Sequence, residues 1–142
     1  MERPRIVIAD DSSEILTLIA KLLSGRYNVV ARALNGKQAV EAVLQLHPDV
    51  LVMDVEMPEM DGIQAAKRLQ STGAATKIVF LTGLEDADHI SNALNLGPYS
   101  YVFKTRCHTD LRPAIMAALQ GKTFCSSRWD GTHSLHKIAR SQ

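Results

Sequence analysis

The sequence predicts an α/β fold built on a doubly wound parallel sheet of five strands. Four short apolar runs indicate strands that are buried on both faces, because they are rich in β-branched residues and too short for helices. These runs end on residues that can take part in chemistry, namely Asp10-Asp11, Asp54, Thr82 and Lys104. Segments with helical periodicity separate the strands and are long enough for right-handed crossovers. The simplest arrangement is a flavodoxin-like sheet of order 2-1-3-4-5 with five helices.

Three strands and two helices are expected in the first part of the chain. The strands are expected over residues 5–9, 27–32 and 48–54. Ser12 or Ser13 can cap the first helix, which Gly25 ends. Asn35-Gly36 forms a turn into the second helix, which must end before Pro48 because the residue before a proline avoids helical conformation.

The second part of the chain is expected to contain three helices and two strands. The expected helices cover residues 63–70, 86–96 and a segment ending near 120, and the expected strands cover 77–81 and 101–103. Thr109 can cap the last helix. Pro113 is tolerable only in a first turn, so the regular part of this helix is expected to start late or to kink.

Length and composition indicate one globular domain. The 142 residues include 46% hydrophobic and 22% charged residues, which are ordinary globular values. A net charge of +1 offers no electrostatic argument for nucleic acid or an anionic membrane. The chain contains neither a stretch of ~20 apolar residues nor a signal peptide at its start, and two cysteines are too few for a disulfide framework. A cytoplasmic location is therefore expected.

The composition changes after Gly121. Residues 122–142 are polar and poorly periodic, and Trp129-Asp130-Gly131 is a turn signal. We therefore expect a folded domain over residues 1–121 and a tail or linker over residues 122–142.

The strand-end residues are expected to lie close together, because parallel strands bring their carboxyl ends to one edge of a sheet. Magnesium prefers oxygen ligands, so Asp11 and Asp54 could bind it directly and Asp10 through water. An ionised carboxylate is also a nucleophile that can form an aspartyl phosphate, and Lys104 and Thr82 could contact the transferred oxygens. Each residue alone has a commoner explanation as a cap, a turn or a solvated charge. Together they favour a magnesium-dependent phosphoryl acceptor at Asp54.

Four motifs resemble those of CheY-like receiver domains of two-component response regulators, over residues 4 to about 121. They are Ile8-Ala9-Asp10-Asp11, residues 53–62, Leu81-Thr82-Gly83 and residues 97–104. The resemblance implies that a histidine kinase or a phosphotransfer protein phosphorylates Asp54.

The same resemblance assigns further roles. It implies that the backbone carbonyl of Glu56 ligates Mg²⁺ or Mn²⁺, and that Thr82 and Tyr101 rearrange together on phosphorylation. It also implies that an effector or a second copy binds the face formed by the fourth helix, fifth strand and fifth helix.

Residues 114–122 resemble the LuxR/NarL-type subgroup, in which a helix-turn-helix module normally follows. The residues after Gly121 are too few for its three helices, and their basic residues are dispersed, so no DNA binding by this chain itself is expected. The chain is therefore either a stand-alone receiver or a truncated LuxR-type transcriptional regulator without its output domain. Pro98 and Thr105 depart from the residues usual in the family, which affects partner choice more than phosphorylation chemistry.

Other function classes explain fewer of these residues. Phosphohydrolases of similar fold usually place a second aspartate two residues after the nucleophile, where this chain has Glu56. A degenerate receiver that is never phosphorylated would not need the full set of acids, threonine and lysine. We therefore expect a switch that is itself modified and is not an enzyme, apart from self-phosphorylation and autodephosphorylation.

The cysteines and histidines form weaker candidate sites. Cys125, His133 and His136 could ligate zinc, although two histidines three residues apart in a polar segment are usually incidental. Cys107 and His108 could form a nucleophile and base, but adjacent side chains seldom face each other. Neither set is expected to be functional.

Overall fold

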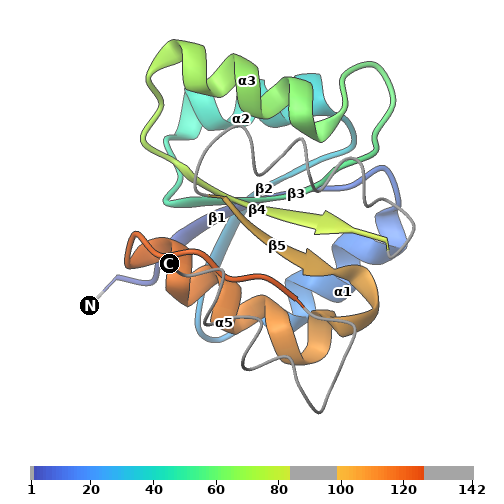
Figure 1. Ribbon diagram of the computed structural model, residues 1–142, viewed down its shortest axis with the longest axis vertical. Coiled ribbons are helices and arrows are strands. Elements are labelled where there is room, and N and C mark those ends of the chain that lie inside the picture. Colours follow the sequence, from blue (N-terminus) through green and yellow to red (C-terminus); the bar gives the residue numbers. More distant parts are fainter. Residues whose placement is uncertain (1, 84–98, 127–142) are drawn as a thin grey trace.

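The computed structural model describes residues 2–83 and 99–126. Its sheet has the order β2-β1-β3-β4-β5, and every neighbouring pair of strands is parallel (Figure 1). The strands are β1 (Arg5–Ala9), β2 (Asn28–Ala33), β3 (Val50–Asp54), β4 (Lys77–Thr82) and β5 (Ser100–Phe103). The predicted fold class and strand order are therefore confirmed.

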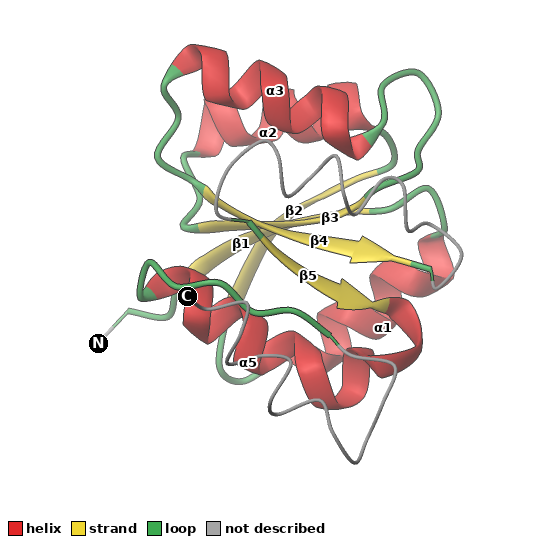
Figure 2. Ribbon diagram, in the orientation of Figure 1, coloured by secondary structure: helices red, strands yellow, loops and turns green. Residues whose placement is uncertain are grey.

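Helices cover both faces of this sheet (Figure 2). They are α1 (Ser13–Leu23), α2 (Gly36–Leu46), α3 (Gly62–Thr72), the 3₁₀-helix η1 (Lys104–Arg106) and α5 (Cys107–Leu119). Helices α2 and α3 lie on one face and α1 and α5 on the other. The helix expected over residues 86–96 lies outside the described residues. Within residues 2–83 and 99–126, no helix is long and apolar enough to span a bilayer.

The sheet separates two apolar cores. In β1, Val7 and Ala9 pack with residues of α2 and α3, whereas Ile6 and Ile8 pack with residues of α1 and α5. All five residues of β3 are buried. This burial on both faces explains why the strands are continuous apolar runs rather than alternating ones.

Short polar side chains begin three of the helices. Ser12, Asn35 and Asp61 each accept a hydrogen bond from a backbone N–H three residues ahead, which satisfies a donor that the helix itself leaves unpaired. Of the two serines considered for α1, the cap is Ser12. Several boundaries differ by one or two residues. For example, β3 begins at Val50 instead of at residue 48, and Tyr27 precedes β2, its buried side chain packing in the core beside α1.

The prediction for the start of α5 was wrong. Helix α5 begins at Cys107, and Thr109 lies inside its first turn with its hydroxyl donating to the Arg106 carbonyl at 3.3 Å. The 3₁₀-turn η1 runs directly into α5, and the Cys107 N–H donates to the Lys104 carbonyl, so no side-chain cap is needed. Because the helix starts early, Pro113 lies in its interior rather than in its first turn.

Residues 122–126, which we call the strap, lie along the outer edge of β5 (Figure 1). The Tyr101 N–H donates to the Phe124 carbonyl at 2.9 Å, and the Ser126 N–H donates to the Tyr101 carbonyl at 3.1 Å. These two bonds form a parallel bridge between Tyr101 and Cys125. The sequence placed these residues in a tail or linker, and the domain boundary at residue 121 stays a prediction.

Candidate functional site

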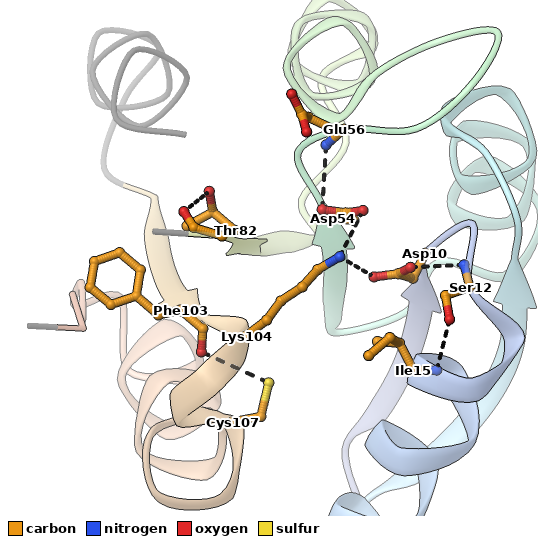
Figure 3. A network of polar contacts seen from close by, with 10 residues as sticks. Asp10, Ser12, Ile15, Asp54, Glu56, Thr82, Phe103, Lys104 and Cys107 are labelled. Carbon is orange, nitrogen blue, oxygen red and sulfur yellow. Dashed lines mark hydrogen bonds and ion pairs between the residues drawn. The ribbon is translucent and has the colours of Figure 1, made fainter. Parts of the chain in front are cut away.

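The carboxyl ends of β1, β3 and β5 bring three predicted site residues together. The Nζ atom of Lys104 lies 3.1 Å from Oδ2 of Asp10 and 3.1 Å from Oδ2 of Asp54 (Figure 3). Asp11 adds a third acid, because one carboxylate oxygen from each of Asp10, Asp11 and Asp54 lies within 4.8 Å of the other two. We call these three aspartates the acidic cluster. The site therefore combines the three carboxylates of this cluster with the one ammonium group of Lys104.

Asp10 is fully buried and is held by the backbone around it. Its N–H donates to the Ala33 carbonyl at 3.0 Å, and its Oδ1 accepts from the Ser12 N–H at 2.9 Å. Its Oδ2 lies near Lys104 but has no partner in hydrogen-bond geometry among the described residues. Sequence reasoning treated Ser12 only as a helix cap, whereas its N–H also orients the Asp10 carboxylate.

Asp54 carries an unusual electrostatic environment. Burial and, to a lesser extent, the neighbouring Asp10 raise its pKa, and Lys104 and the Glu56 N–H lower it; the net effect is a rise from 3.8 to about 6. For Lys104, burial lowers the pKa, but the carboxylates of Asp54 and Asp10 outweigh it, so the net pKa is raised. The lysine is therefore positively charged at neutral pH.

The acidic cluster fits a hard divalent cation such as Mg²⁺ or Mn²⁺. Three carboxylates share one ammonium group, so a cation would relieve their mutual repulsion. Asp10 Oδ2 is a buried oxygen without a hydrogen-bond partner in the described part of the chain, and oxygen is the preferred ligand of Mg²⁺. Asp10, Asp11 and Asp54 are the residues that would hold the ion. Glu56 lies on the loop after β3 with an exposed side chain, and the predicted role of its carbonyl stays a prediction.

Thr82 and Tyr101 lie on the two neighbouring strands β4 and β5. Thr82 is fully buried, and its hydroxyl donates to the Gly83 carbonyl at 3.1 Å, pointing away from Asp54 (Figure 3). Tyr101 is only 3% exposed and packs in the core on the α2–α3 side of the sheet. Their roles in phosphoryl binding and switching stay predictions.

The Asn35-Gly36 turn has a role that sequence reasoning missed. Asn35 caps α2, and its Nδ2 also donates to Glu59 Oε2 at 3.2 Å. The Gly36 N–H donates to the Met60 carbonyl at 2.9 Å, and a Cβ atom on Gly36 would overlap that carbonyl oxygen. The start of α2 therefore holds the loop that follows Asp54. An Asn-Gly pair directly before a helix signals the cap but not these partners.

The weaker candidate sites receive no support. Cys107 is buried, and burial raises its thiol pKa to about 11, so the thiolate is not available as a nucleophile at neutral pH. His108 is exposed. Of the possible zinc ligands, Cys125 is buried beside β5, and both histidines lie outside the described residues.

The fold and the site define a class: a doubly wound parallel α/β domain with an acidic, cation-compatible cluster and a lysine at the carboxyl edge of its sheet. Comparison with known proteins identifies the family. The chain belongs to the response regulator receiver domains, whose family model matches residues 6–116. It is a receiver domain of a two-component response regulator. Receiver domains bind Mg²⁺ through an acidic pocket, and this chain has a matching cluster of aspartates.

Curated relatives combine such a domain with different activities. The chain is 34% identical over 124 residues to the uncharacterized transcriptional regulatory protein YvfU of Bacillus subtilis, covering 86% of this chain and 62% of that protein. It is 38% identical over 104 residues to a protein-glutamate methylesterase/protein-glutamine glutaminase of Nocardioides sp., covering 70% of this chain and 28% of the enzyme. The chain therefore spans less than two thirds of either relative.

Solved structures agree with this assignment. The receiver domain of the putative response regulator NarL from Mycobacterium tuberculosis has a TM-score of 0.80 and 28% identity, covering 86% of this chain and all of that one. A LuxR-family response regulator from Aurantimonas sp. has a TM-score of 0.81 and 26% identity, covering 98% of this chain and 97% of that one. The structural likeness includes the subgroup that the sequence resembles.

Proposed function

We propose that Asp54 accepts a phosphoryl group from the phosphohistidine of a histidine kinase or a phosphotransfer protein, in a reaction that requires Mg²⁺ or Mn²⁺. The observation that carries this proposal is the position of the buried Asp54 carboxylate, 3.1 Å from Lys104 Nζ within the acidic cluster. Membership in the receiver family supports it.

The residues suit this chemistry. A carboxylate oxygen of Asp54 would form the new bond to phosphorus as the bond from phosphorus to the histidine nitrogen breaks. Lys104 already points at the acceptor and would meet the negative charge on the transferred oxygens. A bound cation would neutralise the acids and the incoming phosphoryl group. The Thr82 hydroxyl would turn from the Gly83 carbonyl toward the phosphoryl group.

The proposed output is a change in a binding surface. Thr82 pairs with Phe103 of β5, the strand that also carries Tyr101, so a movement of Thr82 at the site can be passed to β5. We propose that an effector or a second copy of the chain reads this change on a face that includes β5 and α5. The domain would then act as a phosphorylation-driven switch and not as an enzyme.

Labelling with a small acyl phosphate tests the proposal. The protein is incubated with the donor and Mg²⁺, and the modified residue is mapped by mass spectrometry. We expect labelling of Asp54 that disappears in Asp54→Asn or with a chelator, and that persists in Asp49→Asn. Asp49 is an exposed acid just before β3, at the strand's opposite end from Asp54. Full labelling of Asp54→Asn, or labelling that is indifferent to the chelator, would contradict the proposal.

A second candidate concerns the whole gene product. The chain covers 62% of a Bacillus transcriptional regulatory protein, and a LuxR-family regulator is among its structural neighbours. These similarities favour a DNA-binding transcriptional regulator whose output domain is absent from this chain. The gene sequence beyond Gln142 distinguishes the two candidates: a helix-turn-helix module there would support the regulator, and an immediate stop codon would support a stand-alone receiver.

A further inference from the structure

The strap is tied to β5 by more than one kind of contact. Besides the two backbone bonds at Tyr101, the Phe124 N–H donates to Ser100 Oγ at 2.8 Å. The Ser126 hydroxyl oxygen accepts from the Phe103 N–H at 3.1 Å. Cys125 and Ser126 are buried, whereas Thr123 is exposed. The strap is therefore hydrogen-bonded along β5, the strand that ends directly before Lys104.

The Ser126 hydroxyl also reaches the residues on the other side of Lys104. It donates to Asp110 Oδ2 at 2.6 Å, and Arg106 Nε donates to the same oxygen at 3.0 Å. Phe103 comes directly before Lys104, and Arg106 comes two residues after it. Ser126 and Asp110 together therefore hold the backbone before the lysine and the side chain just beyond it. We call this pair the clamp.

The clamp is buried and carries a charge. Ser126 is 4% exposed and Asp110 is 5% exposed. Burial raises the pKa of Asp110, but hydrogen bonds from Ser126, Arg106 and Thr109 outweigh it, so the net pKa is lowered and the carboxylate is ionised at neutral pH. Hydrogen bonds to an ionised carboxylate are stronger than those between neutral groups. The clamp therefore restricts the segment that carries Lys104.

We propose that Ser126 is a positioning residue for Lys104, and that docking of the strap and phosphorylation of Asp54 stabilise each other. This inference rests on the proposed function and names a residue that acts on Lys104 from outside the acidic cluster. With the clamp closed, Lys104 Nζ lies 3.1 Å from Asp54 Oδ2, so its charge is placed before the phosphoryl group arrives. A preorganised charge stabilises a transition state more than one that must first be ordered.

The coupling must act in both directions. If the docked strap favours the phosphorylated state, phosphorylation must favour the docked strap by the same free energy. The position of the chain after Ser126 would then depend on the phosphorylation state. This connection needs no contact between the phosphoryl group and the strap itself, because Phe103 and Lys104 link them.

The first test does not depend on phosphorylation. In the unmodified protein, the NMR signal of the Lys104 ammonium group is compared in wild type, Ser126→Ala, Ser126→Thr and Thr123→Ala. We expect the signal to shift and broaden in Ser126→Ala, to be restored in Ser126→Thr, which keeps the hydroxyl, and to be unaffected in Thr123→Ala. Should Ser126→Ala fail to fold, Asp110→Asn opens the clamp from its other side. An unchanged Lys104 signal in the folded clamp variant would overturn the inference.

The second test separates lysine positioning from metal binding. We expect Ser126→Ala to accept phosphate from a small acyl phosphate about tenfold more slowly, while its Mg²⁺ dissociation constant changes less than about twofold, because the acidic cluster is untouched. In wild type, phosphorylation should slow hydrogen exchange at the amides of Tyr101, Phe103 and Ser126. Equal labelling rates in wild type and Ser126→Ala would overturn the positioning of Lys104 by Ser126, and faster exchange on phosphorylation would overturn the coupling. Absence of Asp54 labelling in wild type would overturn both the proposed function and the coupling. In that case the NMR signal of Lys104 would still show whether Ser126 positions this lysine.

Discussion

Lys104 Nζ lies 3.1 Å from Oδ2 of Asp54 and 3.1 Å from Oδ2 of Asp10, so one ammonium group serves two buried carboxylates. Asp11 adds a third negative charge, because one of its carboxylate oxygens lies within 4.8 Å of an oxygen of Asp10 and of Asp54. Buried charges that are incompletely paired oppose folding, because burial removes their hydration and like charges repel. The cluster therefore favours binding of a cation at the expense of the stability of the metal-free domain.

We expect Asp54→Asn to stabilise the metal-free domain at neutral pH. Burial, with a further contribution from Asp10, raises the folded-state pKa of Asp54 from 3.8 to about 6. The folded state thus binds this proton more tightly than the unfolded state. The free energy of unfolding should fall by about 2–3 kcal/mol as the pH rises from about 4 to about 6, and should stay lower above that range. Asp54→Asn removes this loss.

Urea unfolding with a chelator present measures the effect at pH 4 and pH 7.5. Asp49→Asn is the matched control, because Asp49 is an exposed acid at the opposite edge of the sheet from the cluster. The gap in unfolding free energy between Asp54→Asn and wild type should be larger at pH 7.5 than at pH 4. The same gap at both pH values would show that the ionised Asp54 carboxylate does not destabilise the folded state.

Added Mg²⁺ should stabilise the domain through the acidic cluster. A ligand that binds only the folded state at one hundred times its dissociation constant adds about 2.7 kcal/mol. Asp11→Asn should weaken this stabilisation strongly, because Asp11 is an exposed acid of the cluster whose replacement leaves the core intact. Asp61→Asn is the control: it removes one negative charge near the site, and asparagine caps α3 as well as aspartate does. Thermal unfolding across a Mg²⁺ titration measures the effect, and equal stabilisation of Asp11→Asn and Asp61→Asn would contradict it.

Thr82 should be required for the response of β5 to phosphorylation. Its hydroxyl bonds to the Gly83 carbonyl, and Tyr101 on the next strand is already buried. We therefore expect a shift of Tyr101 within the core, not a transfer from solvent. On phosphorylation, backbone NMR shifts should extend to β5 in wild type and in Thr82→Ser, but stay near the acidic cluster in Thr82→Ala. Equal shifts at Tyr101 in all three proteins would argue against this coupling.

The strand order and the convergence of Asp10, Asp54 and Lys104 could be predicted because each follows a buried apolar run directly. In a parallel sheet, strand order and direction place the ends of such runs at one edge regardless of side-chain detail. The start of α5 could not be predicted in this way. Thr109 is a favourable cap by composition, but η1 supplies the preceding turn, and nothing in the local sequence distinguishes a 3₁₀-turn from a loop.

Contacts between distant polar residues were also beyond sequence reasoning. Asp110 lies in α5 and Ser126 lies 16 residues further on, beyond the end of that helix, and the short strap lacks the alternation that indicates a strand. Asn35 and Glu59 similarly meet only because α2 and the loop after β3 pack together. Hydrophobic patterning describes the layers of this fold, whereas such hydrogen bonds depend on the exact path of loops.

Glu56 should slow the arrival of phosphate at Asp54. Its backbone N–H donates to Asp54 Oδ1 at 3.4 Å, which places this residue at the site, and its side chain is exposed. A negative charge there repels an anionic donor, so Glu56→Gln should be labelled a few times faster by a small acyl phosphate at low ionic strength. Glu41→Gln, an exposed acid on α2, controls for net charge. Labelling rates within about twofold of the Glu41→Gln rate would show that the Glu56 side chain has no effect on the arrival of phosphate.

Gly36→Ala should destabilise the domain even though alanine is the better helix former. By helix propensity alone, this change would stabilise α2 by about 0.5–1 kcal/mol. However, a Cβ atom at position 36 would overlap the Met60 carbonyl oxygen, which accepts the Gly36 N–H. Overpacking of this kind costs about 1–3 kcal/mol, which exceeds the gain in helix propensity, so we expect the net change in stability to be unfavourable.

The same substitution should weaken Mg²⁺ binding, because the loop that carries Met60 begins just after Asp54. Lys37→Ala is the control, since it changes the next, exposed position of α2 without touching the loop. Urea unfolding and Mg²⁺ titration of the two variants separate the contributions of helix propensity and of loop packing. If Gly36→Ala proved as stable as Lys37→Ala and bound Mg²⁺ equally well, the docking of this loop on α2 would have no role in shaping the site.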